Sequence, residues 1–211
     1  MVYIWGHVGE HNVVIASLPA GVYGTTCAAT TASSLIHSLP HIRISVLVGI
    51  EGGIARPDLN QDIRLGDIVA KAKGLWERKD LLNKPPPVLL HALASLQAEH
   101  ELAPSKVPKL LQAMLEINLH MGRPKMDYSQ QGAGNDRLFQ SQYDHISGFT
   151  GGQPDPSWEV DREQRDSTGP EIHYGIIASG NTLIKDAATR DSLWESTGHQ
   201  CLVNSKVKNI L

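Results

Sequence analysis

Three stretches of this sequence combine residue types that could bind a ligand. In each, an apolar run ends in glycine and small polar residues: residues 18–21 (LPAG), 48–53 (VGIEGG) and 178–181 (ASGN). Glycine has no Cβ, so a ligand can approach the backbone closely there. The second stretch also contains a carboxylate, Glu51. A tight turn alone would explain one such stretch, but three at the strand ends of one sheet favour a ligand site.

The sequence lacks the residue spacing that metal sites, nucleotide-binding loops and nucleophile motifs require. His7 and His11 lie on either side of a turn, and Pro40 separates His37 from His41, so neither pair is on a continuous helix. The sequence has no H-E-x-x-H and no Cys-x-x-Cys, which zinc sites use. It also lacks G-x-G-x-x-G, the P-loop pattern and G-x-S-x-G. We therefore expect no metal and no cofactor.

Composition limits the partners and the compartment. The chain has 211 residues, 41% hydrophobic and 19% charged, which is typical of a globular domain. A net charge of −3 with no basic cluster argues against nucleic acid. Two cysteines, Cys27 and Cys201, are too few for a disulfide framework and suit a reducing compartment. The sequence shows no signal peptide and no apolar run near the ~20 residues of a membrane span. We expect a cytoplasmic protein.

The elements that must position these stretches follow from the apolar pattern and the turn residues. Residues 2–18 predict two strands around a turn at 9–12, the second being 13–18. Further strands are predicted at 44–48, 68–70 and 172–178, and helices at 23–38, 88–99, 106–118 and 185–194. The order strand, helix, strand with buried apolar strands is typical of a parallel sheet. We expect one α/β domain over residues 1–211, in which strands 13–18, 44–48, 68–70 and 172–178 are neighbours in one mixed or mainly parallel sheet with helices 23–38 and 185–194 packed on it.

Two parts of the chain do not follow this pattern. Residues 121–170 are rich in Gly, Pro, Asp, Gln and Ser, so we expect a long irregular insertion there, either functional or disordered. Within it, Asp136, Arg137, Tyr143, Asp144 and His145 form a polar and aromatic group, for which a solvated loop is the favoured interpretation. The tail diverges from about residue 196, and its last ten residues predict no particular element.

Several stretches together resemble a known family. They are HNVVIASLPAGVYGTTCAAT, VGIEGGI, DIRLGDIV, LNKPPPVLLHALASLQAEHEL, DRLFQSQYDH and IHYGIIASGNTLIKDAATRD. This set resembles the nucleoside phosphorylase-like domain of filamentous fungi, which belongs to the purine nucleoside phosphorylase and nucleosidase superfamily. The resemblance covers roughly residues 3–195. In large intracellular receptor-like proteins that domain often precedes ATPase or ankyrin-repeat regions.

The resemblance implies a fold, a reaction and a set of site residues. It implies a central twisted sheet flanked by helices, and cleavage of the N-glycosidic bond of purine nucleosides through an oxocarbenium-like sugar. Gly66-Asp67 would start the strand that follows the pocket loop, and residues 182–184 would cover the purine ring. Glu51 is the candidate catalytic acid. The implied nucleoside-binding residues are Gly21, Gly49, Gly52, Gly53, Ser179, Gly180, Asn181, Thr182, Leu183 and Ile184.

The chain also departs from the family pattern. Leu47 and Ile50 stand where many phosphorylases hold phosphate with Arg and Ser, and Glu51 would repel phosphate, so water is the better nucleophile. The resemblance further implies that the family's first strand is missing and that Gln200-Cys201-Leu202 replaces its ribose-binding Met-Glu motif. We therefore expect an incomplete domain with impaired activity, and the homo-oligomers usual in the superfamily. A nucleoside-binding sensor without turnover, or a truncated scaffold of a receptor-like protein, is the alternative.

Overall fold

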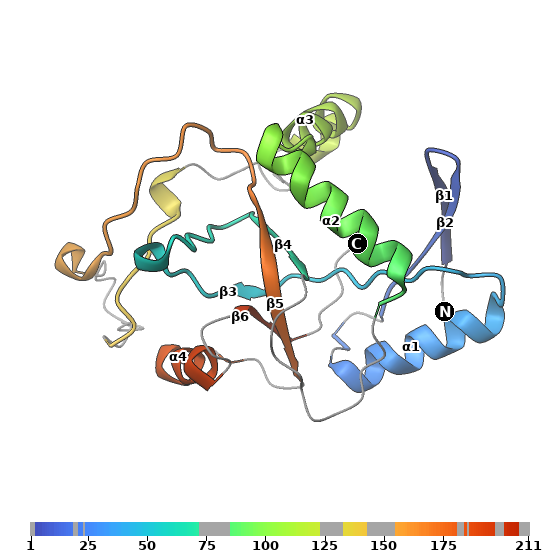
Figure 1. Cartoon of the computed structure of the whole chain (residues 1–211), viewed down its shortest axis with the longest axis horizontal. Helices are drawn as coiled ribbons and strands as arrows, with labels where there is room; N and C mark the ends of the chain where they lie inside the picture. The colour runs from blue at the N-terminus through green and yellow to red at the C-terminus, as the bar shows by residue number, and fades with distance from the viewer. Residues whose placement is uncertain are drawn as a thin grey trace.

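The computed structural model describes residues 3–18, 21–22, 24–71, 85–122, 133–142, 155–180, 184, 186–196 and 201–206. The protein is a mixed α/β chain, as predicted (Figure 1). Its strands are β1 (Tyr3–Val8), β2 (His11–Ala16), β3 (Gly52–Gly53), β4 (Ile68–Lys71), β5 (Ile172–Gly180) and β6 (Cys201–Lys206). Its α-helices are α1 (Thr25–Ser38), α2 (Pro87–Leu102), α3 (Val107–Ile117) and α4 (Ala187–Ser196). Short 3-10 helices are η1 (Pro57–Leu59), η2 (Leu119–Gly122), η3 (Ala133–Asn135) and η4 (Pro156–Trp158).

The larger sheet has four strands in the order β3-β6-β5-β4. β4 pairs with β5 in parallel, from Ile68 opposite Ile172, and β5 pairs with β6 in parallel with an irregularity after Ile176. The predicted strands 68–70 and 172–178 are therefore neighbours, as expected. β3 runs antiparallel to β6 at the edge. β6 comes from the tail, where the sequence predicted no element.

β1 and β2 form a separate two-stranded hairpin. The prediction that strand 13–18 joins the central sheet is wrong, because β2 begins at His11 and pairs with β1. The reason is local: Gly9, with φ +57°, and Glu10 make a two-residue connection. Such a connection brings the two strands together directly and fixes their register.

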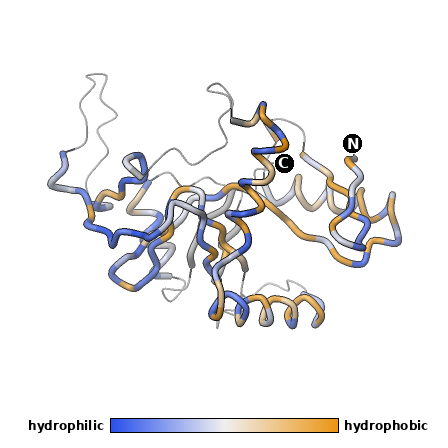
Figure 2. Tube along the Cα trace, turned by 90° about the horizontal axis from the view of Figure 1, so that it is seen from above, coloured by the Kyte–Doolittle hydropathy of each residue, from blue (hydrophilic) through white to orange (hydrophobic). Residues whose placement is uncertain are grey.

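Residues 44–48 do not form a strand, so that prediction is also wrong. They run without regular structure from α1 toward β3, and Val46, Leu47 and Val48 are 76, 64 and 65% exposed. The place beside β6 is taken by β3, a few residues further along the chain. An apolar strand of the buried type needs neighbours on its edges and faces. Figure 2 shows this stretch as a largely hydrophobic run.

The four predicted helices are present, with ends shifted by at most three residues. α4 lies beside β6 and buries Trp194 against Ile54, while a second small core joins Ile63 to Val69 and Ile177. No residue of α1 is buried, so the close packing on the sheet expected of that helix is not found. Among the described residues, none of the helices combines the length and the hydropathy that a membrane crossing requires.

Candidate functional site

The sheet brings two of the glycine-rich stretches together. Gly52 of β3 pairs with Asn204 of β6, and Asn204 in turn pairs with Ala178 of β5. Gly52 and Ala178 therefore lie two strand spacings apart, about 10 Å. Beyond Ala178, Ser179 and Gly180 complete the carboxyl end of β5. Segments that are far apart in the sequence thus meet at the end of the parallel strands.

Gly52 and Gly53 serve different purposes. A Cβ on Gly53 would lie 2.9 Å from Cγ2 of Ile63, so the close packing of the sheet on Ile63 requires glycine there. A Cβ on Gly52 would meet nothing within 4 Å, so the surface beside Gly52 has room for a ligand. Glu51 comes directly before them and is partly buried. Gly52 and Glu51 are thus the better candidates for ligand contact.

The other predicted site residues lie elsewhere or are not described. Gly21 is in the turn before α1, where its φ of +81° favours glycine, and Gly49 is in the exposed stretch before β3. Neither takes part in the ladder between β3, β6 and β5. Ile184 is partly buried. Asn181, Thr182 and Leu183 lie outside the described residues.

The loop between β3 and β4 is anchored on α4, beside the glycine stretch. The Arg56 guanidinium lies 4.2 Å from the centroid of the buried Trp194 ring, and Nε donates a 3.2 Å hydrogen bond to Asp58. That hydrogen bond raises the pKa of Arg56. At the start of α4, Asp186 accepts a 2.7 Å hydrogen bond from the Thr189 backbone N–H. A carboxylate therefore already occupies this helix end, so it does not offer an anion site.

The strongest electrostatic feature is Asp67, whose side chain is only 2% exposed. Its carboxylate accepts hydrogen bonds from Arg165 and from the backbone N–H groups of Arg64 and Glu171, and lies 2.8 Å from His173 Nε2. Burial alone would raise the pKa of Asp67, but these hydrogen bonds hold it far below its usual range. The preceding Gly66 has φ +91°, a conformation that glycine adopts without strain. The sequence predicted the strand start here but not this network.

Asp62 forms a second centre of the same network. Nε of Arg162 donates a 2.6 Å hydrogen bond to Asp62, and Nε of Arg64 donates one of 2.8 Å. Burial raises the pKa of Asp62 less than these two partners lower it. Arg162, 9% exposed, also lies 3.3 Å from Asp136. We call the set Asp62, Arg64, Asp67, Asp136, Arg162, Arg165 and His173 the Asp–Arg clamp.

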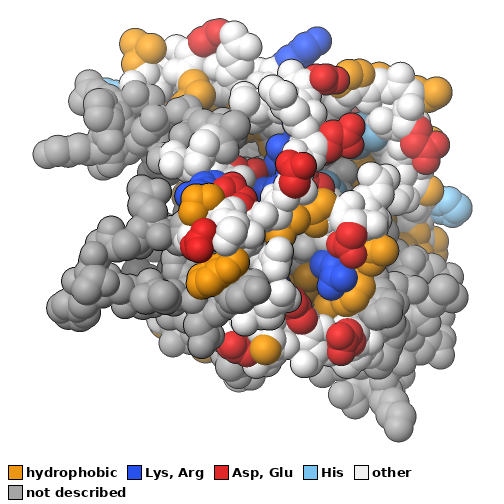
Figure 3. Space-filling model, turned by 90° about the vertical axis from the view of Figure 1, so that its left-hand side faces the viewer, with side chains coloured by type: hydrophobic (Ala, Val, Ile, Leu, Met, Phe, Trp, Pro, Cys, Tyr) orange, Lys and Arg blue, Asp and Glu red, His pale blue; other side chains and the backbone are white. Residues whose placement is uncertain are grey.

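The clamp corrects the solvated-loop interpretation for Asp136, one of the five polar and aromatic residues singled out in the insertion at 121–170. The Asp136 side chain is only 12% exposed, and Arg137 pairs with Glu159 at 2.7 Å. Phe139 forms a bridge with Glu159, so the two described parts of this insertion pair with each other. Tyr143, Asp144 and His145 lie outside the described residues. Figure 3 shows the resulting mixture of acidic and basic side chains on this face.

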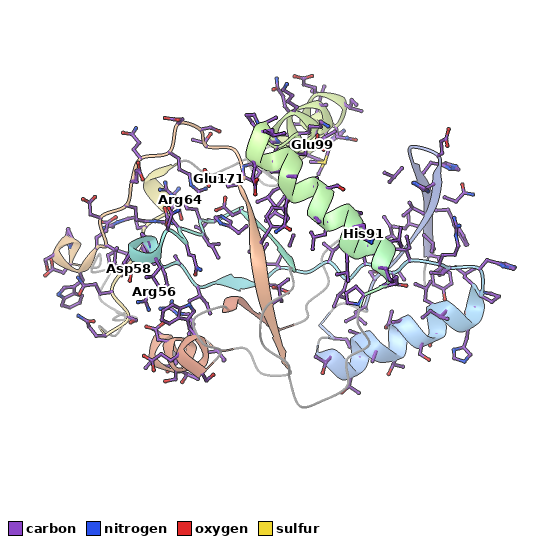
Figure 4. All side chains as sticks on the ribbon, in the orientation of Figure 1. Arg56, Asp58, Arg64, His91, Glu99 and Glu171 are labelled. Atoms are coloured by element: carbon purple, nitrogen blue, oxygen red, sulfur yellow. The ribbon has the colours of Figure 1, made fainter. Side chains whose placement is uncertain are left out.

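Asp67, the most buried acid of the clamp, and the glycine stretch that ends at Gly180 lie at opposite ends of β5. Asp67 and Glu171 come directly before β4 and β5, whereas Gly180 ends β5. Eight steps along a strand cover about 26 Å. Figure 4 shows Arg64 and Glu171 near the beginning of β5. Asp67 and its partners Arg165 and His173 therefore fix the β4–β5 register and lie too far from the carboxyl end of β5 to act on a ligand there.

Comparisons with known proteins give one relative and no family. No known protein family and no solved structure matches the chain. A nucleotide-binding leucine-rich repeat (NLR)-like protein of the fungus Hyaloscypha variabilis is 34% identical over 218 residues. The alignment covers 95% of this chain but 20% of that protein, so the chain spans about a fifth of the relative's length. Within the described residues, no group of three His, Cys, Asp or Glu side chains could hold a metal ion.

Proposed function

We propose that this chain is a purine nucleoside-binding domain of the nucleoside phosphorylase-like type, with impaired cleavage of the N-glycosidic bond. The observation that carries the proposal is the ladder that sets Gly52 about 10 Å from Ala178, across Asn204. In open α/β sheets, ligands bind outside the carboxyl ends of the strands. The room beside Gly52 is at that end of β5.

The finer fold we propose is a twisted, mainly parallel central sheet with helices on its faces. Its support is the run of three neighbouring parallel strands, β4, β5 and β6. The family motifs that include residues 66–69 and 172–180 lie on β4 and β5 or directly before them. The β1–β2 hairpin stands apart from it.

The distribution of acids favours binding over turnover. Departure of a purine needs an acid close to the base, and the sugar needs a second polar group to orient it. Asp62 and Asp67 have lowered pKa values in the clamp, so both remain ionised at neutral pH. Asp67 also lies beside the start of β5, about 26 Å from Gly180. Glu51 is left to serve both tasks, and one carboxylate cannot serve both faces of a sugar. If any cleavage occurs, water is the nucleophile we favour.

The similarity to an NLR-like protein supports a role in sensing. A nucleoside bound at the sheet would be the signal, and other regions of a longer protein would respond to it. The domain needs affinity for this task and no rapid chemistry.

The test combines two measurements on the purified chain with adenosine, inosine and guanosine, each with and without phosphate. We expect at least one nucleoside to raise the unfolding temperature, because a ligand that binds only the folded state stabilises it. We expect free base to form more slowly than about 1 s⁻¹. Faster base release that Glu51→Gln abolishes would favour the enzyme instead. No thermal shift with any nucleoside would favour a scaffold.

A further inference from the structure

Residues 44–50 form an apolar segment whose large side chains are about half to three-quarters exposed. Ile44, Val46, Leu47, Val48 and Ile50 are 49, 76, 64, 65 and 61% exposed. The other two residues are Ser45 and Gly49, so the segment carries no charge. Single exposed apolar side chains are common on protein surfaces, but a contiguous run of them marks an interaction site.

The backbone of this apolar segment is able to pair. No residue from 42 to 51 has a positive φ, and no backbone hydrogen bond joins residues 43–50 to another described residue. The segment leads directly into β3, which is the edge strand of the larger sheet. Unpaired extended backbone at a sheet edge is a template for a further strand.

The charges that flank the apolar segment indicate which strand fits. Arg43 precedes it and Glu51 follows it, and both are four residues from Leu47. If two copies pair antiparallel with Leu47 opposite Leu47, then Arg43 of each copy lies opposite Glu51 of the other. Glu51 already has a contact within its own chain, but a carboxylate accepts several hydrogen bonds.

The same register matches the apolar residues. Ile44 then faces Ile50 of the second copy, and Val46 faces Val48, all on one side of the ladder. Opposed apolar pairs and opposed opposite charges both stabilise antiparallel strands. A second register, shifted by two residues, would place neither Arg43 nor Glu51 opposite its counterpart.

We propose that the apolar segment is a self-association site, at which two copies of this chain pair antiparallel around a two-fold axis through Leu47. This proposal is independent of nucleoside binding. A second copy is the occupant that the segment favours, since the same sequence carries both Arg43 and Glu51, the two residue types that each charge pair between copies requires. A ladder of this length buries less than the ~800 Å² per partner of a standard interface. We therefore expect a dimer with a Kd of roughly 1–100 µM.

A charge-exchange experiment tests the pairing by sedimentation velocity from 1 to 200 µM. Arg43→Glu and Glu51→Arg should each weaken the dimer by about tenfold or more, since each change places like charges opposite each other twice per dimer. The double variant should recover a Kd within about threefold of the wild type. The matched control is Leu102→Lys, because Leu102 is 90% exposed but lies on α2. It should leave the Kd unchanged.

A cross-linking experiment tests the register in a Cys27→Ser and Cys201→Ser background. Leu47→Cys places two thiols opposite each other, at a Cα separation of 4.5–5.5 Å that a disulfide can span. Val46→Cys places them diagonally, about 7–8 Å apart, beyond that span. We expect oxidation to link Leu47→Cys dimers at least tenfold faster than Val46→Cys dimers.

Each other outcome overturns the proposal. The proposal is wrong if the chain stays monomeric up to 200 µM. It is also wrong if the Kd of the dimer is unchanged by Arg43→Glu and by Glu51→Arg. Failure of the double variant to recover the dimer excludes this charge pairing. Equal cross-linking of Leu47→Cys and Val46→Cys excludes the register.

Discussion

Asp67→Asn should destabilise the fold more than the same Asp→Asn exchange at an exposed loop carboxylate, because the Asp67 side chain is only 2% exposed. The buried carboxylate accepts hydrogen bonds from Arg165 and from the N–H groups of Arg64 and Glu171, and lies beside His173. An amide offers one acceptor oxygen and turns an N–H₂ group toward Arg165. Arg165 then loses the buried one of its two carboxylate partners and keeps only the half-exposed Glu171 at 3.1 Å. Breaking a buried pair in this way costs about 3–5 kcal/mol. For a chain of this size that lowers Tm by roughly 6–20 °C.

The direction of the pKa shift of Asp67 determines how the stability deficit of Asp67→Asn changes with pH. The lowered pKa of Asp67 means that its stabilisation is complete above the unfolded-state pKa, about 3.9. It is lost as the pH falls from there toward the folded-state pKa. Urea unfolding at pH 7 should show the full deficit of Asp67→Asn, and the deficit should shrink below about pH 4.

The control for that experiment is Asp58→Asn, whose side chain is 60% exposed and pairs with Arg56 at the surface. Its cost should be about 1 kcal/mol or less. The reasoning is refuted if Asp67→Asn costs no more than Asp58→Asn at pH 7. It is also refuted if the deficit of Asp67→Asn grows on acidification. Either result would mean that the clamp does not hold the β4–β5 register.

Two further predictions concern the edge of the sheet near β3. Gly53→Ala should cost about 1–3 kcal/mol of unfolding free energy by urea titration, because the new Cβ meets Ile63 at 2.9 Å, whereas Gly52→Ala meets open space and should cost less than 1 kcal/mol. Equal losses of unfolding free energy in Gly53→Ala and Gly52→Ala would contradict the close packing of Gly53 on Ile63. Arg56→Ala should lower the unfolding free energy by about 1–2 kcal/mol through the lost contact with Trp194, and the tryptophan emission should shift to the red. An unchanged emission spectrum would contradict that contact.

The sequence alone predicted the elements whose signals come from residues close together in the chain. The turn residues at 9–12 predicted two strands around a turn, which the structure shows as a hairpin with a shorter connection at Gly9 and Glu10, and helical spacing predicted α2 and α3 to within three residues. The largely apolar character of 68–70 and 172–178 predicted neighbouring strands of one mixed or mainly parallel sheet, and β4 and β5 are such neighbours. These signals depend on residues close together in the chain, where hydrophobic spacing and turn chemistry determine the structure.

The sequence alone did not predict the features whose partners are far apart in the chain. Residues 44–48 have the composition of a buried strand, but composition does not name a neighbour, and β3 occupies the place beside β6. β6 itself mixes apolar and polar residues and gave no signal in isolation. The Asp–Arg clamp joins residues about a hundred positions apart, such as Asp62 and Arg162, so no spacing rule could find it. Only the ladder shows that Gly52 and Ala178 lie near each other.

Hydrogen exchange with and without a bound purine nucleoside tests the central claim most directly. In saturating adenosine, inosine or guanosine, we predict slower amide exchange at residues 49–54 and 176–180, with no change around Asp67, at residues 65–67 and 165–173. Gly52→Ala, which leaves the fold intact, should reduce that protection because its methyl group takes the room beside the glycine. No protection with any of the three nucleosides, or protection confined to the clamp, would contradict a nucleoside site at the carboxyl end of β5.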